Sequence, residues 1–164
     1  MTDEKAFDKI HSLLADGKAT QALRHLLDSQ TGRLRKEVAW DANHAWYCVG
    51  GAYFKLEDFK QAVQAYRKAC RVNSQDALAL WALGNSYDAL ARPKLAERAF
   101  RLALDQTMNE RNKAAVLLNL GNALFDQKRF DEAGSVYLQV KGRRDEIGTK
   151  ARKNLKKVME LTAI

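Results

Sequence analysis

Three glycines, Gly50, Gly84 and Gly121, stand 34 and 37 residues apart, and the residues around them recur with them. Such a period is the signature of a repeat architecture, in which each unit buries its apolar face only against its neighbours. One column could match by chance, whereas seven columns in three copies fix the register. The columns around the glycines are Trp46, Leu80 and Leu117; Val49, Leu83 and Leu120; Tyr53, Tyr87 and Leu124; Ala62, Ala96 and Ala133; Tyr66, Phe100 and Tyr137; and Ala69, Ala103 and Val140.

Each copy contains two amphipathic segments joined by a short polar turn, at about 43–56 and 59–72 in the first copy. Asp58 fits the N-cap of the second segment, and Pro93 stands near the start of its counterpart, where proline is tolerated. Glycine in a helix costs about 1 kcal/mol relative to alanine. We therefore predict that Gly50 is the point of closest contact between the two helices of a hairpin.

The pattern resembles the tetratricopeptide repeat, in which tryptophan, glycine, tyrosine, alanine and an aromatic residue recur at fixed offsets over 34 residues. The chain departs from it by Leu80 and Leu117 for tryptophan, Leu124 for tyrosine and Val140 for alanine, and no proline closes a repeat. The resemblance implies an all-α fold, a right-handed α-solenoid of stacked antiparallel helical hairpins. The first copy carries the motif most fully, in Trp46, Val49, Gly50, Tyr53, Ala62, Tyr66 and Ala69.

We expect residues 1–164 to form a single solenoid domain. Residues 5–29 resemble a degenerate further copy, in which Ala22 lies 40 residues before Ala62, so an insertion of about six residues falls within Gln30–Asp41. The apolar residues of the last segment fit a capping helix, because stacked repeats expose an apolar flank at each end. The expected units are 5–29, 43–76, 77–110, 114–142 and a capping helix over 145–162.

Composition favours a globular chain: 46% of the residues are hydrophobic and 29% are charged. The N-terminus resembles no secretory signal, and no long apolar run follows, which predicts a cytoplasmic protein without a transmembrane segment. The two cysteines, Cys48 and Cys70, lie within helical patterns and are predicted to be buried reduced thiols.

The net charge of +8 is concentrated near the C-terminus, where residues 141–164 hold eight basic and three acidic residues. This excess either attracts an acidic partner, such as nucleic acid or an anionic surface, or is a solvated helix face. No aromatic residues are interleaved to stack bases, which argues against nucleic acid. The predicted basic patch is Lys150, Arg152, Lys153, Lys156 and Lys157.

No catalytic constellation or phosphate loop is present in the sequence, so we expect no enzymatic activity and no cofactor. His11, His25 and His44 lie in different segments without a partner motif. They fit packing or surface positions better than metal ligation, and no metal is expected.

The resemblance implies that the first helix of each hairpin lines a concave groove that binds a peptide or protein segment. Gly51 either makes room there for a ligand backbone or has drifted at an exposed position. Trp81 either contacts the ligand or packs on a neighbouring repeat. Asn85 and Asn122 are suited to holding a peptide backbone. The predicted groove residues are Tyr47, Gly51, Phe54, Trp81, Asn85, Asp88, Leu118, Asn122 and Phe125.

Family members that capture acidic chaperone C-termini use a clamp of lysine, asparagine and arginine, which this chain lacks. The corresponding positions hold other residues, in either possible register. We therefore expect a non-catalytic adaptor, scaffold or chaperone that binds another kind of segment, and we leave open whether it forms homo-oligomers. The alternative is a nucleic-acid-associated or acidic-surface-binding protein acting through the basic C-terminal helix. The clamp positions are Tyr47, Gly51, Ala82, Ala115 and Asn119, or Cys48, Leu78 and Ala82 one repeat earlier.

Overall fold

A computed structural model describes residues 3–162, and within that range the regular structure is helical. One isolated antiparallel β-bridge joins Leu27 to Leu34, and the described residues form no β-strand beyond this bridge. The all-α prediction is therefore confirmed. The helices are α1 (Asp3–Ala15), α2 (Ala19–Leu26), α3 (Lys36–Ala39), α4 (Ala42–Lys55), α5 (Phe59–Val72), α6 (Ala77–Ala89), α7 (Pro93–Leu104), α8 (Glu110–Asp126), α9 (Phe130–Val140) and α10 (Glu146–Thr162).

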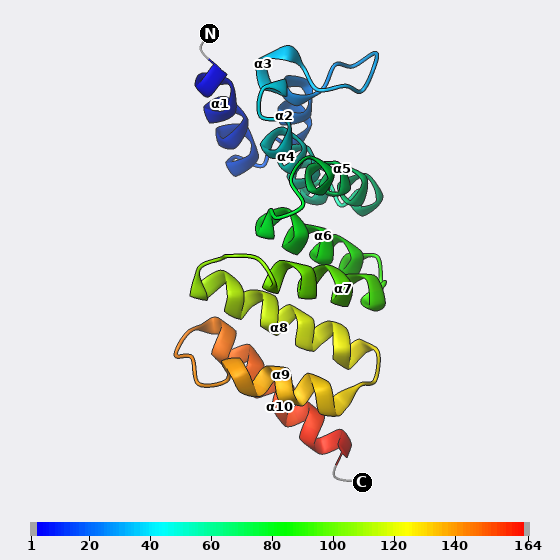
Figure 1. Ribbon diagram of the computed structural model, residues 1–164, viewed down its shortest axis with the longest axis vertical. Helices are drawn as coiled ribbons and strands as arrows, with labels where there is room; N and C mark the ends of the chain where they lie inside the picture. The colour runs from blue at the N-terminus through cyan, green and yellow to red at the C-terminus, as the bar shows by residue number, and fades with distance from the viewer. Residues whose placement is uncertain (1–2, 163–164) are drawn as a thin grey trace.

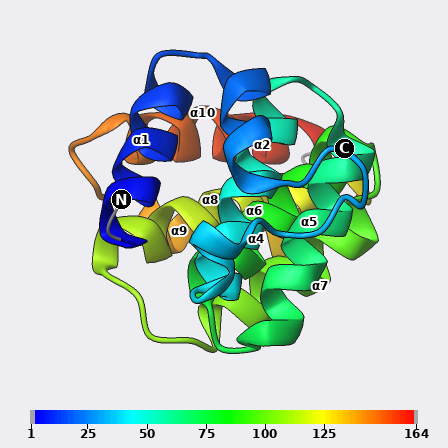
Figure 2. The same ribbon diagram turned by 90° about the horizontal axis from the view of Figure 1, so that it is seen from above.

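The helices pack as successive antiparallel hairpins, α4 with α5, α6 with α7 and α8 with α9, and each hairpin packs on the next (Figure 1). Helices α1 to α3 precede the stack, and α10 closes it against α9 and α8. Viewed along the stack, α4, α6 and α8 overlap near the middle (Figure 2). The chain is thus an α-solenoid of stacked hairpins, as the repeat predicted.

The turn inside each hairpin has the same backbone geometry in all copies. Glu57, Ala91 and Lys128 adopt positive φ angles of 60°, 53° and 61°, and the next residue donates its backbone N–H to a carbonyl five residues earlier. Gly17, between α1 and α2, has a φ of 74° and is followed by the same hydrogen bond, from Lys18 to Leu13. The N-terminal hairpin therefore shares the turn of the clear repeats, although its sequence has diverged.

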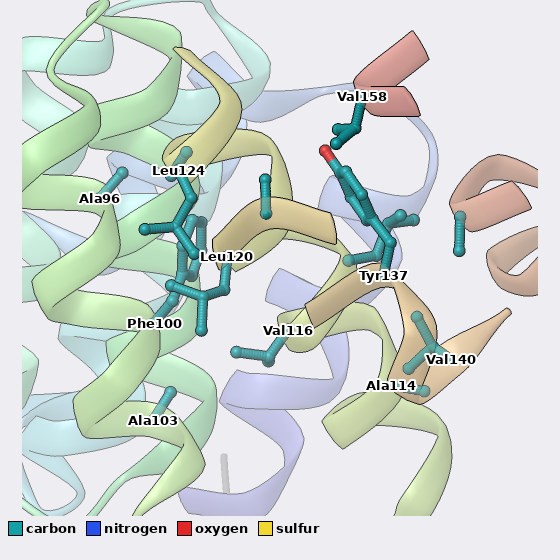
Figure 3. Packing of buried hydrophobic residues seen from close by; sticks show 14 of the residues in the cluster. Ala96, Phe100, Ala103, Ala114, Val116, Leu120, Leu124, Tyr137, Val140 and Val158 are labelled. Atoms are coloured by element: carbon teal, nitrogen blue, oxygen red, sulfur yellow. The ribbon is translucent and has the colours of Figure 1, made fainter. Parts of the chain in front are cut away.

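The close approach predicted at the repeated glycines is the organising contact of each hairpin. A Cβ atom at Gly50 would lie 2.6 Å from the ring of Tyr66, and Gly84 and Gly121 are covered as closely by Phe100 and Tyr137. These aromatic residues are almost fully buried and, in the last two hairpins, belong to one apolar cluster (Figure 3). Glycine recurs at this position in each repeat because an aromatic ring of the second helix occupies the space that a glycine-replacing side chain would need.

Local signals set most helix boundaries where the sequence placed them. Asp58 caps α5 by accepting from the backbone N–H of Gln61 at 3.1 Å, and Pro93 is the first residue of α7. Helix α8 begins at Glu110, four residues before the expected start of its repeat unit at 114. Asn109 accounts for this, because its side chain accepts from the backbone N–H of Asn112 at 2.8 Å and so caps the helix earlier.

Two histidines expected to be isolated lie together in the fold. His11 of α1 and His44 of α4 have their Nε2 atoms 2.8 Å apart, beside the buried thiol of Cys48. Cys70 is a free, partly buried thiol on α5. Among the described helices, none is long and apolar enough to cross a membrane.

Candidate peptide-binding groove

The first helices of successive hairpins adjoin one another, since α6 contacts both α4 and α8. Their inward-facing side chains form two hollows along this face. The first, called here the aromatic pocket, has a volume of ≈ 200 Å³. It brings together four of the predicted groove residues from two different repeats. The lining residues are Tyr47, Phe54, Tyr66, Leu78, Trp81, Ala82 and Asn85.

The walls of the aromatic pocket are held in place by packing. The rings of Tyr47 and Tyr66 lie 5.8 Å apart at 57°, and burial raises the pKa of both phenols above the usual range. Phe54 packs edge-on against Phe59, the first residue of α5, at 5.1 Å. Because these rings are fixed by neighbours, the hollow exists before any ligand arrives.

Trp81 contributes to both the pocket and the core. Its indole is partly buried and packs against the main apolar cluster, while its Nε1 donor is buried without an acceptor among the described residues. The packing alternative raised by the sequence therefore holds, and ligand contact by Trp81 stays a prediction. A test of its role in binding must separate binding from stability.

Gly51 lies on the pocket side of α4, one turn from both Tyr47 and Phe54. A Cβ atom here would come no closer than 3.8 Å to the hydroxyl of Tyr66, in contrast to the closed position of Gly50. A small side chain at Gly51 would therefore make only an ordinary van der Waals contact, and its position in the groove stays a prediction.

The second hollow, called here the polar pocket, has a volume of ≈ 330 Å³ and lies between α6, α8, α9 and α10. Partial burial raises the pKa of the Asp88 carboxyl, and the neighbouring Asp126 carboxylate raises it further. Phe125 packs against Phe130 at 5.2 Å, as Phe54 does against Phe59. The lining residues are Asp88, Asn122, Phe125, Asp126, Tyr137, Asn154 and Lys157.

The two predicted groove asparagines are partly engaged within the protein. Asn85 accepts a hydrogen bond from the side chain of Asn119 at 2.8 Å. Asn122 accepts from the Tyr137 hydroxyl at 2.8 Å and from the Asn154 amide at 2.9 Å. The carbonyl oxygen of Asn122 thus accepts two hydrogen bonds within the protein and that of Asn85 accepts one, and binding of a peptide backbone by these residues stays a prediction.

The structure corrects one predicted groove residue. Leu118 is only 7% exposed and belongs to the main apolar cluster, against which the larger Trp81 and Phe125 side chains pack. It therefore offers little surface to a ligand. Tyr66, Tyr137 and Asn154 were not predicted as groove residues. The first two were assigned to the packing column, and Asn154 lies on the capping helix, outside the repeat register.

The residues of the predicted basic patch on α10 are exposed and differ in their contacts. Lys150 pairs with Glu146 at 2.7 Å, and Lys156 lies 3.8 Å from Glu160. Arg152 donates to the Lys141 carbonyl at 2.6 Å, whereas Lys157 lines the polar pocket. Lys153 is exposed. The positive charge of α10 is therefore divided between local ion pairs, a loop contact and the groove.

Comparison with known proteins agrees with this architecture. Residues 50–90 match the family described as TPR repeat, and residues 82–146 match that described as tetratricopeptide repeat. The type IV pilus assembly protein PilF of Pseudomonas aeruginosa is 33% identical over 93 residues, which are 57% of this chain and 36% of that protein. The chain thus matches only about a third of that relative's length.

Solved structures resemble the whole fold at low identity. The match to a crystal structure of MamA covers 97% of this chain and 81% of the MamA chain, with a TM-score of 0.69 and 20% sequence identity. A second match is the structure of the first TPR of Spaghetti (RPAP3) bound to the HSP90 peptide SRMEEVD. This match covers 85% of this chain and 98% of the RPAP3 chain, with a TM-score of 0.67 and 20% sequence identity. With the two family matches together spanning residues 50–146, the chain belongs to the tetratricopeptide-repeat family.

Proposed function

We propose that this protein is a non-catalytic interaction module that binds an extended protein segment along the face formed by α4, α6 and α8. An apolar or aromatic side chain of the segment enters the aromatic pocket, and a basic side chain enters the polar pocket. In this role the protein acts as an adaptor or scaffold between other proteins.

The observation that carries the proposal is the convergence of Tyr47, Phe54 and Trp81 on one preformed hollow. Aromatic side chains in such pockets supply a large share of the binding energy at protein interfaces. Asn85 lines the same hollow, where its NH2 group is placed to meet a main-chain carbonyl of the segment. Together these groups suit an apolar anchor flanked by extended backbone.

The charge of the polar pocket sets the expected class of ligand. Asp88 and Asp126 contribute two carboxylates, and Lys157 contributes one ammonium group. The RPAP3 structures hold peptides with acidic C-terminal residues, HSP90 SRMEEVD in one case and HSP70 SGPTIEEVD in the other. This chain lacks the basic clamp residues at the matching positions and is acidic farther along the groove. Its ligand is therefore a segment with a lysine or arginine beside an apolar residue.

The scaffold form of this role draws support from the PilF relative, whose name assigns it to pilus assembly. A chain that holds segments of other proteins in a groove is suited to bringing subunits of an assembly together. The alternative role, binding to nucleic acid or an acidic surface through α10, has weaker support because Lys150, Arg152 and Lys157 have other contacts.

A selection from a random peptide library on the immobilised full chain tests the proposal. Enriched peptides are expected to pair an aromatic or large aliphatic residue with a nearby lysine or arginine. Gly51→Leu, which places a side chain over the open end of the aromatic pocket, should weaken their binding by at least about 2 kcal/mol. Trp81→Ala should weaken it as much.

Trp40→Ala is the matched control, because Trp40 is 56% exposed and lies outside both pockets. It should leave peptide affinity unchanged. Circular dichroism of each variant separates loss of binding from loss of fold. A selection dominated by acidic peptides, or one whose peptides bind Gly51→Leu at full affinity, contradicts the proposal.

A further inference from the structure

A cluster of three potential metal ligands lies where α1 contacts α4, and none of the three residues lines either groove pocket. The Nε2 atoms of His11 and His44 are 2.8 Å apart. The Sγ atom of Cys48 lies 3.8 Å from the first of these nitrogens and 3.6 Å from the second. All three donor atoms therefore face one point.

We propose that this cluster binds one zinc ion, with His11, His44 and Cys48 as protein ligands and water in the fourth position. Nitrogen and thiolate sulfur are the donors that zinc prefers, and three protein ligands with one open position are a known form of zinc site. The site lies at the junction between the N-terminal hairpin and the first clear repeat.

The spacing of the donor atoms fits a zinc ion with little rearrangement. A triangle with these three sides has a circumradius of about 2.0 Å, close to a zinc–nitrogen bond and about 0.3 Å shorter than a zinc–sulfur bond. Tetrahedral bonds place nitrogen and sulfur about 3.6 Å apart, against 3.8 and 3.6 Å here, and two nitrogens about 3.3 Å apart. The imidazoles need separate by only about half an ångström.

A tetrahedral ion fits better than a trigonal one. In a trigonal plane the two nitrogens would lie about 3.6 Å apart, farther from the 2.8 Å found between His11 and His44. A trigonal arrangement of two imidazoles and one thiolate is typical of copper. The short nitrogen–nitrogen distance therefore favours zinc with a fourth ligand.

Helix geometry and packing hold the ligands in register. His44 and Cys48 are four residues apart on α4 and so share one face of the helix. Phe7, one turn before His11 on α1, packs against both imidazoles, with ring centroids 6.2 Å from His11 and 4.8 Å from His44. The rings are thus oriented by an aromatic side chain.

Exposure and charge also suit an ion at this position. Cys48 is buried, His44 is half-buried and His11 is exposed, so the site is closed on the protein side and open to water on the other. Burial and the neighbouring His11 imidazole lower the pKa of His44, while the carboxylates of Asp41 and Asp76 act in the opposite direction. Asp41 also caps α4 by accepting from the backbone N–H of His44 at 3.0 Å, which fixes the start of the helix that carries two ligands.

The alternative is a direct hydrogen bond between the two imidazoles, in which one Nε2 donates and the other accepts. Cobalt titration of the reduced full chain distinguishes them, because Co²⁺ occupies zinc sites and reports thiolate ligation by a near-ultraviolet charge-transfer band. We expect that band, four-coordinate visible bands, a stoichiometry of one ion per chain and displacement by Zn²⁺. Absence of the charge-transfer band, or Cu⁺ binding without Zn²⁺ binding, overturns the proposal.

Variants sharpen the test, since the chain offers a matched control for each type of ligand. His11→Ala and Cys48→Ala should each reduce Zn²⁺ affinity at least about tenfold. The control variants His25→Ala and Cys70→Ala remove a histidine and a cysteine outside the cluster. Each should change the Zn²⁺ affinity less than twofold. Zn²⁺ should also raise the melting temperature of wild type, because a ligand that binds only the folded state stabilises it, but not that of His11→Ala. Equal losses in the controls, or full affinity in His11→Ala, contradict the assignment.

Discussion

A Cβ atom at Gly50 would meet the ring of Tyr66 at 2.6 Å, whereas one at Gly51 would approach only its hydroxyl, at 3.8 Å. Two neighbouring glycines in one helix therefore have different surroundings. The first admits an aromatic ring of the second helix, and for the second we predict a position in the groove. Sequence alone could assign the first role, because Gly84 and Gly121 repeat it, but the second has no repeated partner.

Substitution by alanine should separate the two glycines by the sign of its effect on stability. Gly50→Ala should destabilise the protein by about 1–3 kcal/mol, because the buried Tyr66 ring cannot move aside. Gly51→Ala should stabilise it by up to about 1 kcal/mol through improved helix propensity. Urea unfolding of both variants measures the difference. Equal effects of the same sign would contradict the packing described for this helix.

Asp88 gives the proposed ligand binding a pH dependence. Its raised pKa means that this carboxyl takes up a proton at a higher pH than an ordinary aspartate does. Binding of a basic peptide should therefore weaken as pH falls through that raised pKa, before ordinary carboxylates titrate. Asp88→Asn should reduce affinity about threefold to fivefold at neutral pH, as expected for an exposed ion pair, and should abolish this early pH response. Fluorescence anisotropy with a selected basic peptide measures both, and an unchanged pH profile in Asp88→Asn would refute the assignment.

At the scale of elements, α10 completes the stack by covering the flank of the last hairpin. Ala151 and Val158 are buried in the main apolar cluster. Asn154 links α10 to Asn122 of α8 at 2.9 Å. The capping role was predictable from the apolar spacing of this segment. The hydrogen bond was not, because it depends on how α10 sits against a helix 32 residues earlier.

Deleting residues 147–164 should expose the apolar flank of α8 and α9 and cause aggregation at low and high salt alike. The matched control is the pair Lys153→Gln and Lys156→Gln, which removes exposed charge from the same helix without touching its buried face. That variant should remain folded and monomeric in size-exclusion chromatography. A deletion variant that stays soluble, monomeric and equally stable would refute the capping role.

At the scale of the whole molecule, most of the fold was predictable because the same types of residue recur at the same offsets in each repeat. The groove was predictable only in part. Tyr47, Trp81 and Asn85 line one pocket, whereas Leu118, at the position equivalent to Tyr47 and Trp81, is buried in the main apolar cluster. The meeting of His11 with His44 depends on the packing of a divergent hairpin that carries no repeat register. Only the spacing of His44 and Cys48, four residues apart, gave a signal in the sequence.

The central claim, that the aromatic pocket anchors a bound segment, is tested most directly by NMR of the indole N–H groups. The chain has three tryptophans, of which only Trp81 lines this pocket, while Trp40 and Trp46 lie elsewhere. During titration with a peptide selected on the full chain, the Trp81 indole resonance should shift and saturate with the binding curve. The other two resonances should stay in place. A Trp81 resonance that stays fixed while that of Trp40 or Trp46 moves would contradict the account.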